Sequence, residues 1–336
     1  MAAPLTISQA PDLVDRSMQL VFTKASEPDL QSPKYFNTRK TTDYYEKDSS
    51  LSGLGEADFV DENSVIVSDT GVQGYDKTYT QNMISLIYPF SWKMWRFGIE
   101  KRNLNNVAQE LKNSIARTKE KLCAERLDNG FDNVTSYTHS GQGGSKSITV
   151  TGGDALNAFD DDHTREDGGT NMNNYIYDGT TYNLPFDYPG LKAAHRTASL
   201  MVDPRGNPRP AKLDTLVCKT GSSVYYKMVE ILGAIKNGKI PESNDNDASG
   251  VPAYKIVQLD YLTNASYWFA FDSSRALSER EGFQFVESQG AKIDPPNVVY
   301  KTKEIQTSAT AIFDLGHNDV TRSWVGSRGT SANPTD

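Results

Sequence analysis

The stretch NLNNVAQELKNSIARTKEKLCAERL, residues 103–127, has the longest helical pattern in the chain, and the other segments are placed around it. Its apolar residues fall on or beside one stripe at helical spacing, and its interior contains neither Pro nor Gly. Asn103 can cap the first turn, and Asn129-Gly130 supplies a left-handed stop. The pattern predicts a helix of about 37 Å, whose packing face is formed by Val107, Leu111, Ile115 and Leu122.

The opposite face of this helix is charged, because it carries Lys112, Lys119, Glu120 and Lys121. We therefore expect one side of the helix to meet a sheet or a partner while this side stays in water. Taken alone, such a pattern is typical of an amphipathic helix in any α+β domain. We expect the apolar stripe to pack on strands from the end of the chain, residues 297–315.

Composition limits the classes of protein to which the chain can belong. It has 336 residues, which suggests two domains or one domain with large excursions. Its net charge of −8 argues against sequence-specific DNA binding, since such proteins are usually basic. The two cysteines, Cys123 and Cys218, lie far apart and indicate a reducing compartment rather than a disulfide framework. We expect neither a signal peptide nor a bilayer-spanning segment.

The residues before the long helix form two segments of different character. Residues 1–56 contain a short amphipathic pattern at 11–25, followed by a polar, Tyr-rich stretch without a period, which indicates an extended arm. Residues 57–98 read as two strands, one around Val65 and Val67 and a return strand with alternating apolar residues from Ile84 onward. Because Pro89 lies inside the return strand, we expect this strand either to be an edge strand or to end near that residue. Because two strands alone are marginal in water, we expect this excursion to rest on another subunit.

The residues after the helix first lack regular structure and then regain it. Residues 128–190 are rich in Gly, Asp and Asn. Helical and strand patterns then alternate from residue 191 to about 275, with a turn at 203–208, and predict a compact α/β unit. The final segment returns to strand patterns and ends in a polar tail.

An acidic cluster is the main candidate for chemistry. Oxygen ligands of this kind suit hard cations, but the spacing lacks the Gly and the terminal Glu of an EF-hand loop. A solvated surface loop is the favoured interpretation, and a metal-dependent enzyme using residues 160–167 is a lesser alternative. No zinc-protease, nucleophile-elbow or P-loop pattern occurs, so we predict no catalytic, cofactor-binding or metal residues. The cluster comprises Asp160, Asp161, Asp162, His163, Glu166 and Asp167.

The order of these segments and several local motifs resemble the major capsid protein of tailed bacteriophages, which has the HK97-like fold. NAFDDDHTREDGGTNMNN at 157–174 is similar to a loop of one branch of that family. The family's helix, turn, strand and following helix are matched by LKAAHRTASLMVDPRGNPRPAKLDTLVCKTGSSVYYKMVEIL at 191–232. Its paired strands are matched by YKIVQLDYLTNASYWFAFDS at 254–273, and its terminal motif by DVTRSWVGSRGT at 319–330.

The resemblance implies an α+β, HK97-like capsid fold divided into named parts. Residues 1–56 would be the N-terminal arm and 57–98 the extended loop. Residues 99–144 would form the peripheral domain with its spine helix at 103–127. Residues 145–275 would form the axial domain, and 276–336 the strands that close the peripheral domain, with the C-terminal tail.

The resemblance also implies a function without catalysis. The chain would be the major capsid protein of a tailed double-stranded DNA phage, assembling as pentamers and hexamers into an icosahedral shell in the cytoplasm of the host bacterium. It would need no cofactor and no membrane. Its partners would be its own copies, scaffold, portal and decoration proteins, and packaged DNA, held non-specifically through Lys112, Lys119 and Lys121. The alternative is an encapsulin-like nanocompartment shell. No isopeptide cross-link is predicted.

Overall fold

The computed structural model describes residues 30–51, 53–62, 65–71, 73–93, 104–131, 135–141, 144–236, 253–278 and 281–330. The helix expected at 11–25 and the cap expected at Asn103 lie outside these residues. The described elements, in chain order, are η1 (Ser32–Lys34), β1 (Asn37–Lys40), β2 (Tyr45–Leu51), β3 (Gln73–Thr80), β4 (Asn82–Ser91), α3 (Leu104–Asp128), β5 (Ser136–Gly141), β6 (Gly144–Thr149), α4 (Tyr188–Ser199), β7 (Thr215–Lys219), α5 (Ser223–Lys236), β8 (Lys255–Leu259), β9 (Trp268–Phe271), α6 (Ser273–Ala276), β10 (Gln284–Ile293), β11 (Asn297–Val299), β12 (Glu304–Gly316) and β13 (Trp324–Ser327).

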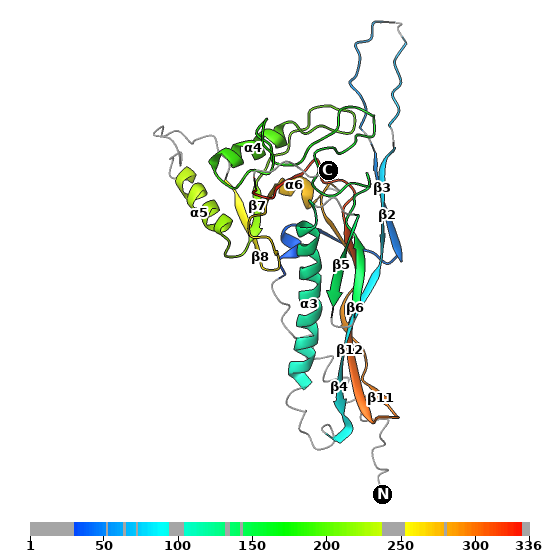
Figure 1. Cartoon of the computed structure of the whole chain (residues 1–336). Helices are drawn as coiled ribbons and strands as arrows, with labels where there is room; N and C mark the ends of the chain where they lie inside the picture. Colours follow the sequence, from blue (N-terminus) through cyan, green and yellow to red (C-terminus); the bar gives the residue numbers. More distant parts are fainter. Residues whose placement is uncertain are drawn as a thin grey trace.

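The long helix α3 lies along a five-stranded sheet in the elongated part of the molecule (Figure 1). The strand order is β1-β10-β12-β11, and β4 pairs with β12. Strand β12 alternates buried and partly buried residues, as expected when one face of a strand is covered. The covered face packs on α3, so the residues from the end of the chain brace the helix in its middle.

The end of α3 is built differently from the sequence-based expectation. The helix does stop at Asp128, and Asn129 N and Gly130 N continue the turn by donating to Glu125 O and Leu127 O. Gly130 is not among the described glycines with a positive φ, so the prediction that it ends the helix in a left-handed conformation is wrong. The chain packs tightly here, because a Cβ at this position would lie 3.1 Å from Cδ2 of Phe159.

The two-stranded excursion involves other strands than those expected. Strand β2 pairs antiparallel with β3, so the hairpin spans residues 45–80 rather than lying within 57–98. The expected return strand, β4, instead forms an edge of the large sheet against β12. Its alternation is real, since Ile84 and Leu86 pack on the main core. The edge position also tolerates Pro89, as predicted.

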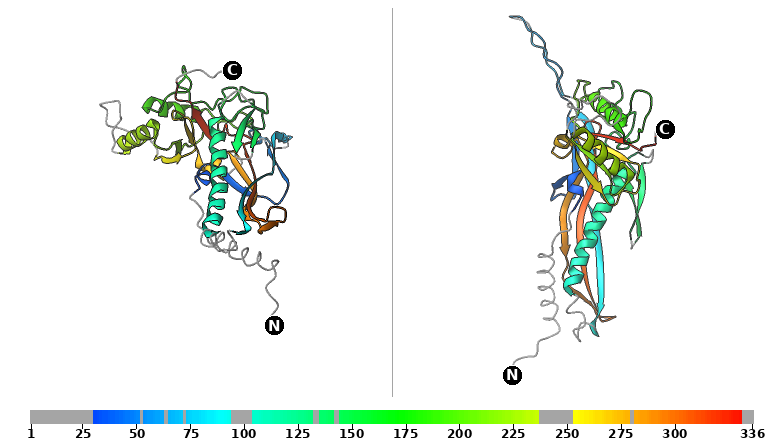
Figure 2. Two further views of the ribbon diagram at one scale, coloured as in Figure 1. Left: turned by 60° about the horizontal axis from the view of Figure 1, so that its bottom comes forward. Right: turned by 90° about the vertical axis from the view of Figure 1, so that its left-hand side faces the viewer.

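A second, smaller unit lies beside the top of α3 and has its own core (Figures 1 and 2). Its sheet has the order β13-β9-β7-β8, with β7 and β8 parallel and joined through α5. Helix α4 covers β13. The last strand therefore joins this unit, because Trp324 to Ser327 pair with β9, whereas we expected the final strands to close only the larger one. Buried members of this core include Phe186, Leu191, Leu216, Met228 and Trp268.

Candidate functional site

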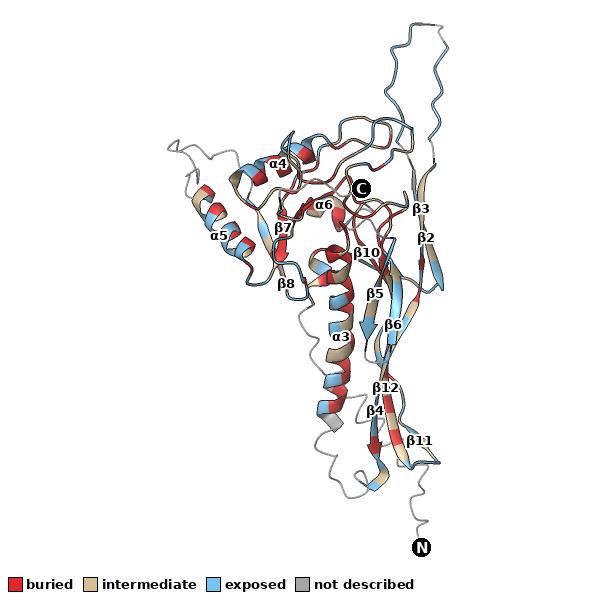
Figure 3. Cartoon of the chain, viewed as in Figure 1, coloured by how far each residue is buried: buried red, intermediate tan, exposed pale blue. Residues whose placement is uncertain are grey.

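The β2–β3 hairpin carries an extension that leaves the body of the molecule, which we call the projecting loop (residues 53–62 and 65–71; Figures 1 and 2). It exposes large apolar side chains over its length, and Phe59 is fully exposed. Figure 3 shows the described residues of the loop as exposed. Contiguous exposed apolar residues of this kind mark interaction sites in soluble proteins. The residues concerned are Leu54, Phe59, Val60, Val65, Ile66 and Val67.

The projecting loop is also strongly acidic. Its described residues contain several carboxylates and neither Lys nor Arg. Its surface therefore combines apolar side chains with one sign of charge, which suits a partner surface that is apolar and basic. The carboxylates are Glu56, Asp58, Asp61, Glu62 and Asp69.

The shaft of the hairpin is fixed to the body through β3. Tyr75 Oη lies 2.7 Å from Thr164 Oγ1. The backbone oxygen of Tyr75 accepts a hydrogen bond of 2.9 Å from Asn318 Nδ2, and Lys77 Nζ donates to the carbonyl of Thr151 at 2.7 Å. The hairpin thus leaves the body from a defined base.

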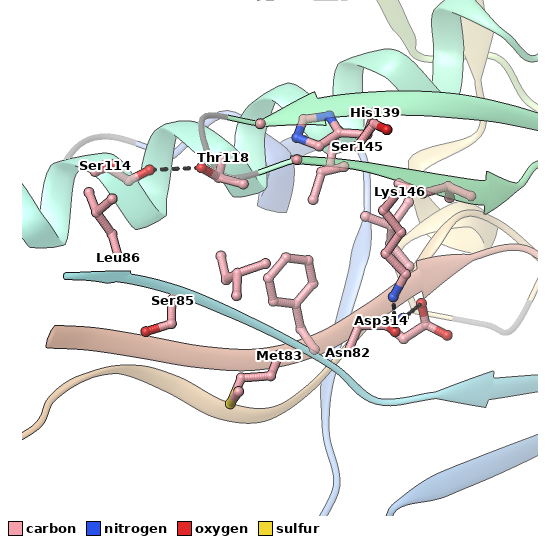
Figure 4. A pocket seen from close by; sticks show the side chains of 17 residues that line it. Asn82, Met83, Ser85, Leu86, Ser114, Thr118, His139, Ser145, Lys146 and Asp314 are labelled. Carbon is pink, nitrogen blue, oxygen red and sulfur yellow. Dashed lines mark hydrogen bonds between the residues drawn. The ribbon is translucent and has the colours of Figure 1, made fainter.

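A hollow of 480 Å³ opens between α3, β4, β12 and the β5–β6 hairpin, and we call it the α3 groove (Figure 4). Thr118 Oγ1 donates to Ser114 O along the helix side, and His139 Nδ1 lies 2.7 Å from Glu125 Oε2. Lys146 reaches across the groove to the side-chain oxygen of Asn82. The groove is therefore apolar inside and polar at its rim. Its apolar lining is formed by Ile84, Leu86, Leu122, Ile148, Phe313 and Leu315.

The residues predicted for the packing face of the helix all lie inside the subunit. Val107, Leu111, Ile115 and Leu122 are buried and belong to one core cluster together with residues of β4, β10 and β12. Figure 3 shows buried residues along much of α3. This surface holds the subunit together and is not itself exposed to a partner.

The expectation that the charged face of α3 stays in water is wrong for most of its residues. Lys112, Lys119 and Glu120 are buried, and only Lys121 is exposed. The reason is that the helix is covered on more than one side. Segment 31–34 crosses it, where Glu120 accepts hydrogen bonds from the backbone N–H and hydroxyl of Ser32 at 3.0 and 2.7 Å.

The ammonium group of Lys119 has a partner inside the subunit. Its Nζ lies 2.5 Å from Glu287 Oε1 on β10, and it sits 5.7 and 5.5 Å from the ring centroids of Phe285 and Phe313. The aliphatic stem of Lys can be buried against apolar groups while its charge is paired. Lys121, in contrast, only pairs with Glu125 along the helix at 3.6 Å.

Two acidic residues of the 160–167 cluster form ion pairs with arginines. Arg322 Nη2 lies 3.4 Å from Glu166 and 3.0 Å from Asp319, and Arg165 pairs with Asp167. Within the described parts of the chain, no group of three or more His, Cys, Asp or Glu residues is arranged to hold a metal ion. The same residues contain no helix long and apolar enough to cross a bilayer.

A buried polar cluster lies beneath the base of the hairpin. Arg126 Nη2 is 3.0 Å from His317 Nδ1. Since a guanidinium can only donate, Nδ1 accepts, and the imidazole is neutral with its proton on Nε2. Burial, followed by the positive charges of Arg126, Lys77 and His163, holds the pKa of His317 well below its usual value.

The second histidine of this cluster behaves in the opposite way. His163 Nδ1 lies 2.6 Å from Asp154 Oδ2. Burial alone lowers the pKa of His163, but the hydrogen bond with Asp154 and the negative charges of Asp154, Asp319 and Asp160 raise it overall. The two imidazoles thus favour different protonation states at the same junction.

These shifts predict how the stability of the unassembled subunit depends on pH. Because the pKa of His317 is depressed on folding, its contribution is present above the unfolded value near 6.5 and is lost as the pH falls below it, by roughly 1 kcal/mol per pH unit. His317→Gln should abolish this part of the loss when urea unfolding is measured at pH 7.5 and 5.5.

His163→Gln serves as the comparison. Its contribution has the opposite sign, since a raised pKa stabilises below the unfolded value and is lost as the pH rises through the folded one. This variant should retain the acid loss due to His317. An equal acid loss in wild type and His317→Gln would contradict the assignment of a neutral, Arg126-bound imidazole.

Comparisons with known proteins gave similarity at the level of solved structures. No protein-family model and no curated protein matches the chain. A structure from Microbacterium phage Oxtober96 aligns with a TM-score of 0.49 and 10% identity, covering 90% of this chain and 91% of the other. One from Mycobacterium phage Patience has a TM-score of 0.48 and 10% identity over 100% and 91%. The virus-like particle from Pyrococcus furiosus has a TM-score of 0.45 and 8% identity over 94% and 98%.

The fold is assigned from the arrangement of the chain's own elements. A long helix is braced by closing strands, a hairpin with an extended loop leaves its base, and a smaller α/β unit sits at one end. The chain has an α+β fold of the HK97-like type, as the sequence predicts.

Proposed function

We propose that the chain is the major capsid protein of a tailed double-stranded DNA bacteriophage, assembling as pentamers and hexamers into an icosahedral shell. The observation that carries the proposal is the projecting loop, whose large apolar side chains have no cover from their own chain. A subunit that assembles into rings needs different surfaces on its two sides, because head-to-tail contacts close a ring only when unlike patches meet. A loop that projects from one side supplies one of these patches.

The α3 groove supplies the other patch in this proposal. It is apolar inside, and two exposed cations lie at or near it, Lys146 in its lining and Lys121 on the helix turn beside it, together with the carboxylate of Asp314. The projecting loop is apolar and acidic. We therefore assign the loop of a second copy as the occupant of the groove, with apolar contacts providing affinity and charges providing orientation.

The proposal gives the chain a structural role in the virion and no catalytic one. Scaffold, portal and decoration proteins would be its further partners, and assembly would take place in the host cytoplasm. Contact with packaged DNA would be non-specific and sensitive to salt. Of the lysines expected at the DNA, Lys121 is the exposed one, so the basic surface offered by α3 is small.

Electron microscopy of the expressed full chain tests the proposal directly. We expect capsomer rings or closed shells, with scaffold supplied where the chain alone does not close. A chain that stays monomeric under every condition, scaffold included, would overturn the proposal. Paired cysteines provide a second test: Ile66→Cys combined with Ser145→Cys should form a disulfide between subunits if the loop occupies the groove.

A second shell function is favoured by one observation. Because Lys112 and Lys119 are buried, little of the expected DNA-facing charge remains. An encapsulin-like nanocompartment needs no such charge, since it encloses protein instead of a genome. Absorbance at 260 and 280 nm of particles purified from the natural host distinguishes the two: nucleic acid inside the particles supports the phage capsid, and enclosed protein without nucleic acid supports the nanocompartment.

A further inference from the structure

One side chain of the body holds both legs of the projecting loop. Arg205 Nη1 lies 2.6 Å from Asp69 Oδ2, and its Nη2 donates to Thr70 O at 2.5 Å. The same carboxylate oxygen accepts a hydrogen bond of 2.6 Å from the backbone N–H of Gly55, which lies on the opposite leg. We call these contacts the Arg205 node. Through Asp69, a single guanidinium ties the outgoing and returning chain to the body.

The turn that presents Arg205 is braced by several hydrogen bonds. Asp203 Oδ1 accepts hydrogen bonds from the backbone N–H groups of Arg205 and Asn207 at 2.9 and 2.8 Å. Asp203 N donates to Asn207 O at 2.9 Å, which closes the turn from the other side. Gly206 has a φ of +84°, a conformation that favours glycine. The backbone of Arg205 is therefore held at a defined place on the body, from which the side chain reaches Asp69 and Thr70.

Position 206 also lies close to the end of a neighbouring side chain. A Cβ there would lie 2.3 Å from Nη2 of Arg165, whose own chain segment contacts the base of the hairpin through Thr164 and Tyr75. The turn is thus packed against the segment that anchors β3. This packing joins the Arg205 node to the base of the hairpin.

Beyond the node, the described residues of the loop have no other tether to the body. Of its described residues, 56–62 and 65–68 are all exposed and form neither hydrogen bonds nor ion pairs with the body. The direction in which Phe59 and Ile66 are presented is therefore decided at the Arg205 node and not further out. The hydrogen bonds to Asp69 also lower the pKa of its carboxyl, that from Gly55 first and that from Arg205 next, so the charge persists at acidic pH.

We propose that Arg205 is the positioning residue for assembly: it sets the direction of the projecting loop before the loop meets a second copy. The assembly part of this inference rests on the proposed function, while the positioning part does not. Asp69 is substantially exposed, so the ion pair is screened by salt and can be released. The node therefore holds the loop in one direction in the free subunit and can open once a second copy has taken up the loop.

Hydrogen exchange of the unassembled subunit tests the positioning part. In Arg205→Ala, and in Asp69→Asn, the backbone amides of Gly55 and Thr70, which both donate to the Asp69 carboxylate, should exchange roughly two- to five-fold faster than in wild type, the range expected for an exposed ion pair. Arg205→Lys should lie close to Arg205→Ala, because one ammonium cannot reproduce the forked contact to Asp69 and Thr70. In wild type, 1 M NaCl should produce a similar increase, since the screening length falls to about 3 Å.

Arg196→Ala is the matched control. Arg196 lies on α4, donates to the carbonyl of Asp178 and makes none of the contacts to the projecting loop. It should leave exchange of the loop amides unchanged. Unchanged loop exchange in Arg205→Ala, with the melting temperature of wild type, would overturn the inference.

Particle size provides the second readout. Arg205→Ala should assemble into shells of more than one size or into irregular sheets, because the loop meets its neighbour at more than one angle. Uniform wild-type shells from Arg205→Ala would overturn the role in assembly even if loop exchange is faster. If wild type itself forms no shells, the proposed function fails, whereas the exchange experiment still decides whether Arg205 positions the loop.

Discussion

Replacing Ile115 with Asp is expected to destabilise the subunit by about 3–5 kcal/mol and to prevent any assembly. Ile115 is 3% exposed and lies in the middle of α3. It belongs to the core cluster that contains Phe90 of β4 and Phe313 of β12. A carboxylate at this position would be surrounded by apolar groups and could be accommodated only by protonation or by moving the helix off the sheet.

The effect should be visible before assembly is considered. Urea unfolding of the purified subunit should show a lower midpoint, and Leu111→Asp should give a loss of similar size, since Leu111 is equally buried. Asn106→Asp changes the charge by the same amount on an exposed part of the helix and should shift the free energy of unfolding by less than about 0.5 kcal/mol. Wild-type stability in Ile115→Asp would show that another stripe of α3 faces the sheet.

The helix and its sheet could be predicted because their patterns are local. The 3.6-residue period of α3 and the alternation in β4 and β12 both follow from one covered face, so each is visible without knowing the partner. The HK97-like fold could be recognised from the order of such segments. Pro89 on an edge strand is a further case, since the missing N–H restricts the position of Pro whatever the topology.

The sequence-based prediction placed the hairpin at the wrong residues because ion pairs, and not only apolar contacts, stabilise strand β2. Arg39 pairs with Glu46 at 2.7 Å and lies 3.7 Å from Asp48, which is almost completely buried. A strand whose buried positions include Asp shows no apolar alternation, so β2 could not be told from an extended arm. Val65 and Val67 do alternate, but in the projecting loop nothing from their own chain covers them.

The lysines of α3 could not be placed for a related reason. A charged face of a helix is usually solvated, and nothing near Lys119 in the sequence indicates its burial. Its partner Glu287 is 168 residues away. The contact of Arg205 with Asp69 likewise joins residues 136 positions apart. Such pairs depend on how distant segments meet, which a single sequence does not specify.

Removing apolar side chains from the projecting loop should prevent assembly without changing the stability of the subunit, in contrast to Ile115→Asp. The triple variant Phe59→Ser, Val65→Ser, Ile66→Ser removes apolar side chains that are exposed in the isolated chain. The folded subunit therefore loses no buried contact when they are removed, and the unfolding midpoint of the variant should equal that of wild type. If a second copy buries them, each is worth about 1.5–3 kcal/mol.

The loss for three side chains is then about 4–9 kcal/mol for each loop contact, which weakens that contact by at least about 1,000-fold. Sedimentation velocity and electron micrographs should show only unassembled subunits at concentrations where wild type forms shells. Ala57→Ser, on the same exposed loop, should assemble normally, because it removes little apolar surface. Normal shells from the triple variant would mean that the loop is not the surface that joins the subunits, and a lowered unfolding midpoint would mean that the loop packs on its own chain in solution.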